Sequence, residues 1–288
     1  MYKFDPRGEP VDVTFRVIAA DQLGEALADL ERHDDDGRSV VHEARRRCKK
    51  LRGLLRLVRP AFADYDKESA AIRDAAALLS HLRDAEVLRQ TVGGLAEDSG
   101  DAALAGIAAR LPVAPSVPAD DAHLAEFRNR LLAARDRAQH WQLETTGALV
   151  LLDGLRQTYR TAARRMARAS RTHAPTDFHD WRKACKYHGF HIDLLKRAAP
   201  DLLAAELDLV DRLSTLLGRH HDLTVLHEAA DRDPDRFGNA TEVVTLRAAC
   251  DGRRSDIETE ALDLGRQIFA ERPRSLRRRF AAYWKASI

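Results

Sequence analysis

Residues 41–60 read VHEARRRCKKLRGLLRLVRP and place eight Lys or Arg side chains beside one acid, Glu43. At 100° per residue, the polar residues that fall within about 80° of one another on a helix are His42, Arg45, Lys49, Arg52 and Arg56. The neighbouring arc is apolar and holds Ala44, Leu51, Leu54, Leu55 and Val58. The stretch therefore predicts an amphipathic helix with a narrow row of cations beside its core-facing side.

The charge of the whole chain is nearly balanced. Its 288 residues include 47 Lys or Arg and 45 Asp or Glu, which give a formal net charge of +2. The segment 156–173, in contrast, has no acid and holds Arg156, Arg160, Arg164, Arg165, Arg168 and Arg171. This balance excludes a uniformly basic nucleic-acid coat, so an anion site has to come from local clustering of cations.

Composition and periodicity predict an all-α protein. Ala, Leu and Arg recur throughout, and aromatic residues make up only 6% of the chain. We expect the alternating segment 11–17 to be a loop that enters the first helix, with Thr14 as N-cap, and Thr176 or Asp177 to cap a later helix. Further helices are predicted over 40–59, 66–92, 100–110, 120–140, 142–172, 177–198, 201–230, 240–270 and 273–285, with room for one break in 66–92 and in 201–230.

The cysteines and the apolar runs indicate the compartment. Cys48, Cys185 and Cys250 are odd in number and have no CxxC spacing, so we expect reduced thiols and no disulfide. No apolar run reaches membrane-spanning length, and the N-terminal segment has no signal-peptide core. We therefore expect a cytoplasmic protein without a membrane segment, and the sequence indicates no cofactor.

An internal repeat is more informative than any single motif. VHEARRRCKKLRGLLRL (41–57) aligns with FHDWRKACKYHGFHIDLL (178–195), and LRDAEVL (82–88) aligns with HHDLTVL (220–226). Two matches in the same order indicate a duplication. The residue pairs that match are His42 with His179, Glu43 with Asp180, Arg45 with Arg182, Arg46 with Lys183, Lys49 with Lys186, and Asp84 with Asp222.

The duplication predicts the domain organisation. We expect one domain over residues 1–288, with a first helical half at 10–110, a proline-rich connection at 111–121 and a second half at 122–288. The two halves should pack about a pseudo-twofold axis, which would bring both rows of cations to one shared cavity or groove. The second row is shorter, because Gly189 and Asp193 stand where the first copy has Arg52 and Arg56.

Rows of like charge one helical turn apart repel each other, and a bound anion relieves the repulsion. Arg offers a fork that matches phosphate oxygens, Lys offers a point charge, and His gains charge beside phosphate. A solvated helix face is the ordinary alternative, but it gives no reason for matched residue types in two diverged copies. The predicted site residues are His42, Arg45, Arg46, Lys49, Arg52, Arg56, Arg156, Arg160, Arg164, His179, Arg182, Lys183 and Lys186.

Both motifs resemble those of the CHAD family, the conserved-histidine α-helical domain, whose halves each carry His-x-x-Arg-x-x-x-Lys-x-x-Arg. His42, Arg45, Lys49 and Arg52 match the first motif, whereas the second departs from it at Gly189. The resemblance implies two pseudo-symmetric four-helix-bundle-like halves packed around a basic central pore or groove. It also implies non-catalytic binding of inorganic polyphosphate and targeting to polyphosphate granules.

Three other functions remain open at this stage. His42 or His179 could serve a phosphoanhydride-processing or phosphohistidine enzyme, although no Walker loop or carboxylate cluster for metal accompanies them. A metal site could use His179, His188, His191, His220 and His221. Nucleic acid could bind weakly through its backbone, as other polyanions could, although no pattern for reading bases is present. The sequence does not indicate an oligomeric state.

Overall fold

The computed structural model describes residues 2–31, 38–79, 84–113 and 122–288, and its regular elements in these ranges are all helical. No helix within these ranges is both long and apolar enough to cross a membrane. The α-helices are α1 (Val11–Glu31), α2 (Arg38–Val58), α3 (Tyr65–Ala77), α4 (Asp84–Ser99), α5 (Ala102–Arg110), α6 (Ala122–Ala138), α7 (Leu149–Thr172), α8 (Pro175–Leu195), α9 (Pro200–Arg232), α10 (Ala240–Ile268) and α11 (Pro273–Ala286). Short 3-10 turns η1 (Arg59–Ala61), η2 (Lys196–Ala198) and η3 (Pro234–Arg236) connect some of them.

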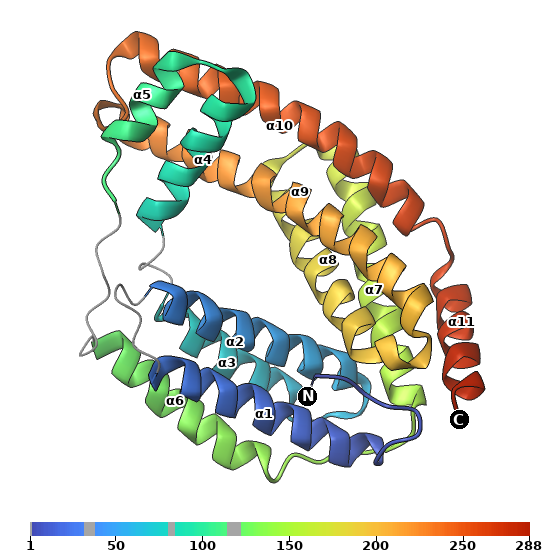
Figure 1. Ribbon diagram of the computed structural model, residues 1–288. Coiled ribbons are helices and arrows are strands. Elements are labelled where there is room, and N and C mark those ends of the chain that lie inside the picture. The colour runs from blue at the N-terminus through green and yellow to red at the C-terminus, as the bar shows by residue number, and fades with distance from the viewer. Residues whose placement is uncertain (1, 32–37, 80–83, 114–121) are drawn as a thin grey trace.

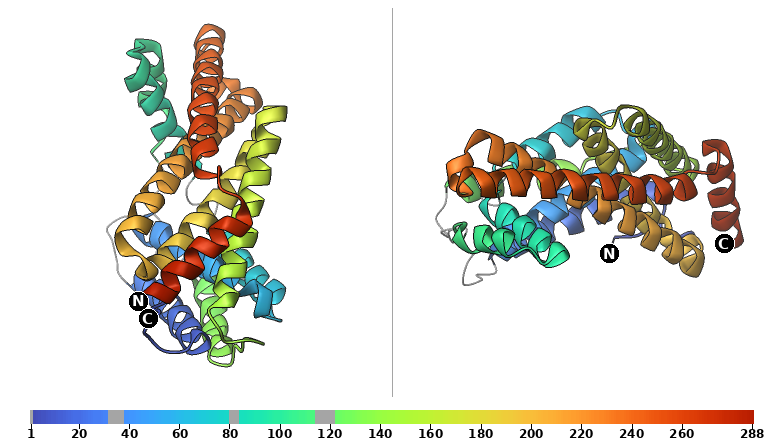
Figure 2. Two further views of the ribbon diagram at one scale, coloured as in Figure 1. Left: turned by 90° about the vertical axis from the view of Figure 1, so that its right-hand side faces the viewer. Right: turned by 90° about the horizontal axis from the view of Figure 1, so that it is seen from above.

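The helices form two groups in space (Figure 1). Helices α1, α2, α3 and α6 pack side by side, while α7, α8, α9 and α10 pack in succession with α11 against α7. The pair α4 and α5 packs on α9 and α10, at the far end from α11 (Figure 2). This spatial grouping crosses the sequence division at 111–121, since α6 follows that connection and packs with α1 and α3. Residues 114–121 of the connection lie outside the described residues.

Two predicted helix starts were wrong. The segment expected as an entering loop is already the first turn of α1, because Val11, Phe15 and Ile18 are buried on one helical face. Thr14 does not cap this helix, and its hydroxyl donates to the Glu9 carbonyl at 3.2 Å. Helical burial of one face therefore outweighs the strand-like alternation of β-branched residues.

The start of α8 is the second correction. The helix begins at Pro175, which suits the first helical position because that residue's missing N–H would have no helical partner anyway. Neither Thr176 nor Asp177 caps it. The carboxylate of Asp177 instead accepts from the Thr172 hydroxyl at 2.7 Å and pairs with Arg168 Nε at 2.7 Å. Elsewhere, the expected break divides segment 66–92 into α3 and α4, whereas α9 is continuous.

The three cysteines are all free and buried, and the structure pairs none of them. Burial raises the pKa of Cys48 and of Cys250 to about 12, and that of Cys185 well above its ordinary value. The thiols are therefore protonated and act as small apolar core residues.

Two glycines let α2 approach the second group of helices. A Cβ at Gly53 would lie 2.9 Å from the Phe190 side chain of α8, and a Cβ at Gly154 of α7 would overlap the Leu57 carbonyl. His191 Nε2 is 3.0 Å from the Gly53 carbonyl oxygen, a buried contact between α8 and α2. Gly53 and Phe190 occupy matched positions of the internal repeat, so the two copies meet at equivalent residues. This junction brings the cations of α2 beside α7 and α8.

Candidate anion-binding site

Helix α2 separates its apolar and cationic residues as the sequence predicts. Val41, Ala44, Cys48, Leu51 and Leu55 are buried in the core. The predicted row of cations lies outside it, with His42 and Lys49 exposed and Arg45, Arg52 and Arg56 half-buried. The row therefore lies at the edge of the core, where the backbone fixes its spacing while the charged ends reach solvent.

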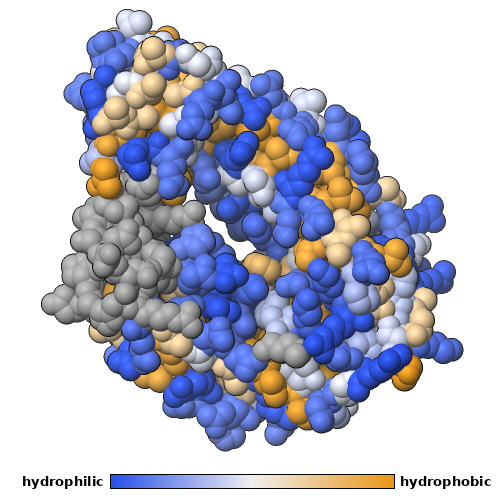
Figure 3. All heavy atoms as spheres, viewed as in Figure 1, coloured by the Kyte–Doolittle hydropathy of each residue, from blue (hydrophilic) through white to orange (hydrophobic). Residues whose placement is uncertain are grey.

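A pocket of about 410 Å³ opens where α2 meets α7 and α8. Seven basic side chains and a single carboxylate line it, together with Thr158, Thr161, Ala184, Tyr187 and Phe190. The charged residues are Lys49, Arg52, Arg56, Arg165, Arg182, Lys183, Lys186 and Asp180. Figure 3 shows the molecule hollowed between α2 and α9, with mainly hydrophilic residues around the hollow. Both copies of the predicted motif thus contribute cations to one pocket.

One cation of α2, Arg56, is supported by an aromatic ring of α8. The guanidinium carbon of Arg56 lies 4.3 Å from the centre of the Tyr187 ring, a cation–π contact that supports it from one side. The Nε groups of Arg52 and Arg56 are buried and make no hydrogen bond to any described residue. Buried donors without acceptors are costly, and an anion in the pocket would satisfy them.

On α8, burial lowers the pKa of Lys186, and the neighbouring Arg182 acts in the same direction while Asp211 opposes it. Desolvation and like charge both disfavour the protonated amine. An incoming anion would relieve the repulsion and favour the charged form of Lys186. The second copy is therefore electrostatically prepared for the same class of ligand as the first.

Each motif copy also contains an acid that pairs with a cation three residues later. Glu43 pairs with Arg46 at 2.5 Å, and the matched Asp180 pairs with Lys183 at 2.6 Å. Asp180 additionally pairs across helices, with its Oδ2 at 3.0 Å from Arg165 Nη1. The hydrogen bond from Lys183 is the main cause that holds the pKa of Asp180 below its ordinary value.

Seven of the predicted site residues do not line this pocket. Arg45 donates to the Ala76 carbonyl at 3.2 Å, Arg46 is engaged by Glu43, and His42 is exposed on the same helix. On α7, Arg156 pairs with Asp153 at 3.5 Å, while Arg160 and Arg164 are exposed on the outer side. The remaining one is His179, which lies in a neighbouring pocket.

His179 and His221 contact each other in that neighbouring pocket, which has a volume of about 450 Å³. Their ring centroids are 4.1 Å apart and the rings are tilted by 38°. Burial lowers the pKa of each histidine to about 4, with nearby cations acting in the same direction. Arg165 and Asp180 line both pockets, whereas the neighbouring one also holds the acids Asp177 and Glu228. The concentration of positive charge therefore falls sharply beyond Asp180.

The other three histidines considered for a metal site, His188, His191 and His220, are buried inside the fold. His188 and His191 are completely buried, and burial lowers the pKa of each to about 3. His220 Nε2 lies 3.0 Å from a carboxylate oxygen of Glu258. In the described ranges, no three His, Cys, Asp or Glu side chains are grouped so as to hold a metal ion.

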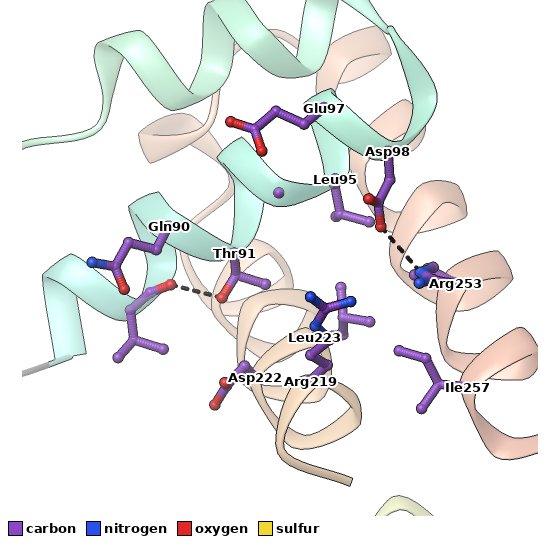
Figure 4. Close-up of a pocket in the computed structure, with 12 residues that line it drawn as sticks. Gln90, Thr91, Leu95, Glu97, Asp98, Arg219, Asp222, Leu223, Arg253 and Ile257 are labelled. Carbon is purple, nitrogen blue, oxygen red and sulfur yellow. Dashed lines mark hydrogen bonds and ion pairs between the residues drawn. The ribbon is translucent and has the colours of Figure 1, made fainter. Parts of the chain in front are cut away.

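A third pocket, of about 430 Å³, lies between α4, α9 and α10 (Figure 4). Its charged lining is mixed and consists of Arg219, Arg253, Glu97, Asp98 and Asp222, with Arg253 Nε paired with Asp98 at 3.2 Å. Such a balanced lining does not concentrate an anion. Of the matched aspartates, Asp222 lies here, and the side chain of Asp84 is outside the described residues.

The predicted site lacks Arg165, Tyr187 and Phe190, which line the pocket. Arg165 belongs to the arginine-rich segment, but the four-residue spacing within that segment favours Arg156, Arg160 and Arg164. A usable signal was the core face of α7, since buried Ala162 precedes Arg165 by three residues and the other three arginines lie away from that face. Nothing in the sequence marked Tyr187 and Phe190, because their role depends on where α2 crosses α8.

Gly189, the departure in the second motif, faces α9. A Cβ there would lie 3.3 Å from Val210 Cγ1 and 3.8 Å from Leu207 Cδ1. Gly189 is buried, whereas its match Arg52 is half-buried at the pocket. An Asp211 carboxylate oxygen would lie 3.6 Å from the same Cβ, so a longer side chain here requires side chains of α9 to move.

Comparisons with known proteins agree with the motifs. The family model of the CHAD domain matches residues 21–231, which is most of the chain. No curated protein and no solved structure matches the chain.

Proposed function

The chain belongs to the CHAD family, and we propose that it binds inorganic polyphosphate, without catalysis, in the pocket between α2, α7 and α8. One observation carries the proposal: three helices direct seven cations and one carboxylate at a single pocket. Polyphosphate is a flexible chain of closely spaced negative charges. A row of Arg and Lys binds such a chain by releasing its condensed counterions, as proteins do on nucleic-acid backbones.

The same proposal accounts for the predicted cations outside the pocket. A long chain that fills the pocket continues over the exposed Arg160 and Arg164 of α7, or along α2 toward His42. We further propose that the hollow of Figure 3 belongs to a basic central pore between two pseudo-symmetric halves. The contact between the matched positions Gly53 and Phe190 supports this arrangement.

The positions of the two motif histidines favour binding without catalysis. His42 is exposed outside the pocket, and His179 contacts His221 in the neighbouring one. Incubating the protein with long-chain polyphosphate and magnesium should release no phosphate above a protein-free control. Sustained release would show an enzyme and would contradict this part of the proposal.

The direct test is a binding titration with long-chain polyphosphate. Replacing Lys49, Arg52, Arg182 and Lys186 with alanine should weaken binding at least ~100-fold at low salt, because each charge-assisted contact contributes more than 1 kcal/mol. A control variant with alanine at the exposed Lys67, Arg236, Arg274 and Lys285 removes the same charges elsewhere. Equal affinity of the two variants would refute the site, and circular dichroism checks that both stay helical.

Competition and localisation extend the test. At equal phosphate concentration, DNA should compete less well than polyphosphate, because the pocket lines up cations and has no base-reading residues.

We also propose that the protein is cytoplasmic and associates with polyphosphate granules. A fluorescent fusion should colocalise with granules, and the four-alanine variant should stay dispersed.

A further inference from the structure

Asp180 is the single carboxylate among the side chains that line the 410 Å³ pocket. Its two oxygens engage two cations of the pocket on different helices, Lys183 at 2.6 Å and Arg165 at 3.0 Å. It therefore occupies those cations in the way that an oxygen of a bound phosphate would. The matched acid, Glu43, pairs only along its own helix and does not line the pocket.

Asp180 also lies at the boundary between two pockets. Beyond it lies the pocket of His179 and His221, whose lining includes the acids Asp177 and Glu228. Its charged lining, Arg165 and Arg168 against Asp177, Asp180 and Glu228, favours a polyanion less than the 410 Å³ pocket does. Asp180 thus lies where a mainly cationic lining gives way to a mainly acidic one, and it holds Arg165 and Lys183 there.

We propose that Asp180 makes the pocket selective for long phosphate chains by withholding Arg165 and Lys183 from short ones. The inference rests on the proposed binding of polyphosphate here. A short chain reaches cations of the pocket other than these two, and it is repelled by the carboxylate. A long chain fills the pocket, displaces Asp180 from both partners and offsets the loss of two partly exposed ion pairs, which are individually weak.

The test compares inorganic tripolyphosphate with long-chain polyphosphate on wild type and on Asp180→Asn. The substitution should strengthen tripolyphosphate binding at least ~10-fold, because two cations become available and a repelling charge is removed. Long-chain affinity should rise by no more than ~3-fold, since wild type already uses these cations for long chains. The salt dependence of tripolyphosphate binding should steepen by roughly one to two phosphate contacts.

Asp211→Asn is the matched control. Asp211 interacts with Lys186 from α9 but does not line the pocket. Removing its charge should raise the affinity for both ligands by the same small factor and leave the selectivity for chain length unchanged. Equal gains for both chain lengths in Asp180→Asn, as in this control, would overturn the inference.

Arg165→Gln tests the same inference by removing one of the two cations that Asp180 engages instead of removing the acid. It should lower the affinity for long chains several-fold and change the affinity for tripolyphosphate by less than ~2-fold, because short chains do not reach Arg165 in wild type. A larger loss for tripolyphosphate than for long chains would contradict the role of Asp180. Wild type that fails to bind even long-chain polyphosphate would instead refute the proposed function.

Discussion

The two copies of the basic motif carry matched residues on α2 and α8 and yet present different surfaces. Helix α2 keeps one side open, so Arg52 and Arg56 reach the pocket beyond Lys49. Helix α8 packs between α7 and α9, and its later positions are the buried His188, Gly189 and His191. Each copy presents three cations to the pocket, so the helices that cover a copy decide which of its positions supply them.

The largest effect is expected from restoring the arginine that the second motif lacks at position 189. Gly189→Arg should lower the free energy of unfolding by roughly 1–3 kcal/mol, because the side chain would be forced against Val210 and Leu207, although the Asp211 carboxylate is close enough to pair with the cation. Thermal unfolding measures the change. Gly189→Ala is the size control and should stay within about 1 kcal/mol of wild type. A stable Gly189→Arg protein with tighter polyphosphate binding would show that α9 does not limit the second copy.

Binding should also depend unequally on the two copies. Alanine at Lys49, Arg52 and Arg56 removes the same formal charge as alanine at Arg182, Lys183 and Lys186. We expect the α2 variant to lose about tenfold more affinity, which is about 1.4 kcal/mol. It removes two forked guanidinium groups where the α8 variant removes one, and Asp180 already engages Lys183.

Titration of both variants with long-chain polyphosphate at one salt concentration measures the difference. Helicity and thermal stability should match wild type in each case, since all six side chains lie outside the buried core. Equal losses would indicate that only the total charge matters. A larger loss for the α8 variant would reverse the comparison.

The sequence predicted much of the site because the repeat pointed to it. Periodicity placed Lys49, Arg52 and Arg56 on one side of α2, and the alignment with α8 added Arg182 and Lys186; the pocket unites all five. Both steps use information local to one helix or shared by two copies. The helical class was predictable for the same reason, because one buried stripe of each helix is visible in its own residues.

What the sequence did not predict depends on contacts between distant segments. Which side of α7 meets α2 is fixed by the close approach at Gly154, and that contact selects Arg165 over Arg160 and Arg164. The packing of α6 with α1 and of α4 with α9 likewise joins residues far apart in the chain. A periodic pattern within one helix does not predict which other helices that helix packs against.

The buried histidines distinguish the copies by their response to pH. His188 aligns with Leu51, and neither of its ring nitrogens has a hydrogen-bond partner among the described residues. Its pKa is lowered to about 3 by burial, against an ordinary value of about 6.5 in an unfolded chain. Between these values the unfolded state binds a proton that the folded state does not. Stability therefore falls on acidification, by at most about 1.4 kcal/mol per pH unit from this group.

His188→Leu makes the second copy resemble the first and should flatten this dependence. We expect the free energy of unfolding of the variant to change less between pH 6 and pH 4 than that of wild type, with the slope reduced by about 1 kcal/mol per pH unit. Denaturant unfolding at several pH values measures it. Gln142→Leu, at an exposed position that does not titrate, is the control and should keep the wild-type slope. An unchanged slope in His188→Leu would mean that His188 does not stay neutral in the folded protein.

The smallest expected effect concerns the acids at matched positions. Glu43→Gln removes a charge from α2 just as Asp180→Asn does from α8, but Glu43 pairs only with Arg46 and lies away from the pocket. Its hydrogen bond to Arg46 holds the pKa of Glu43 below its ordinary value, so the carboxylate is charged at neutral pH. We expect Glu43→Gln to change tripolyphosphate and long-chain affinity by less than ~2-fold, because exposed pairs contribute little and salt screens them. A gain in tripolyphosphate binding comparable to that of Asp180→Asn would show that the acids act through net charge alone, and the distinction between the two copies would then rest only on the cations.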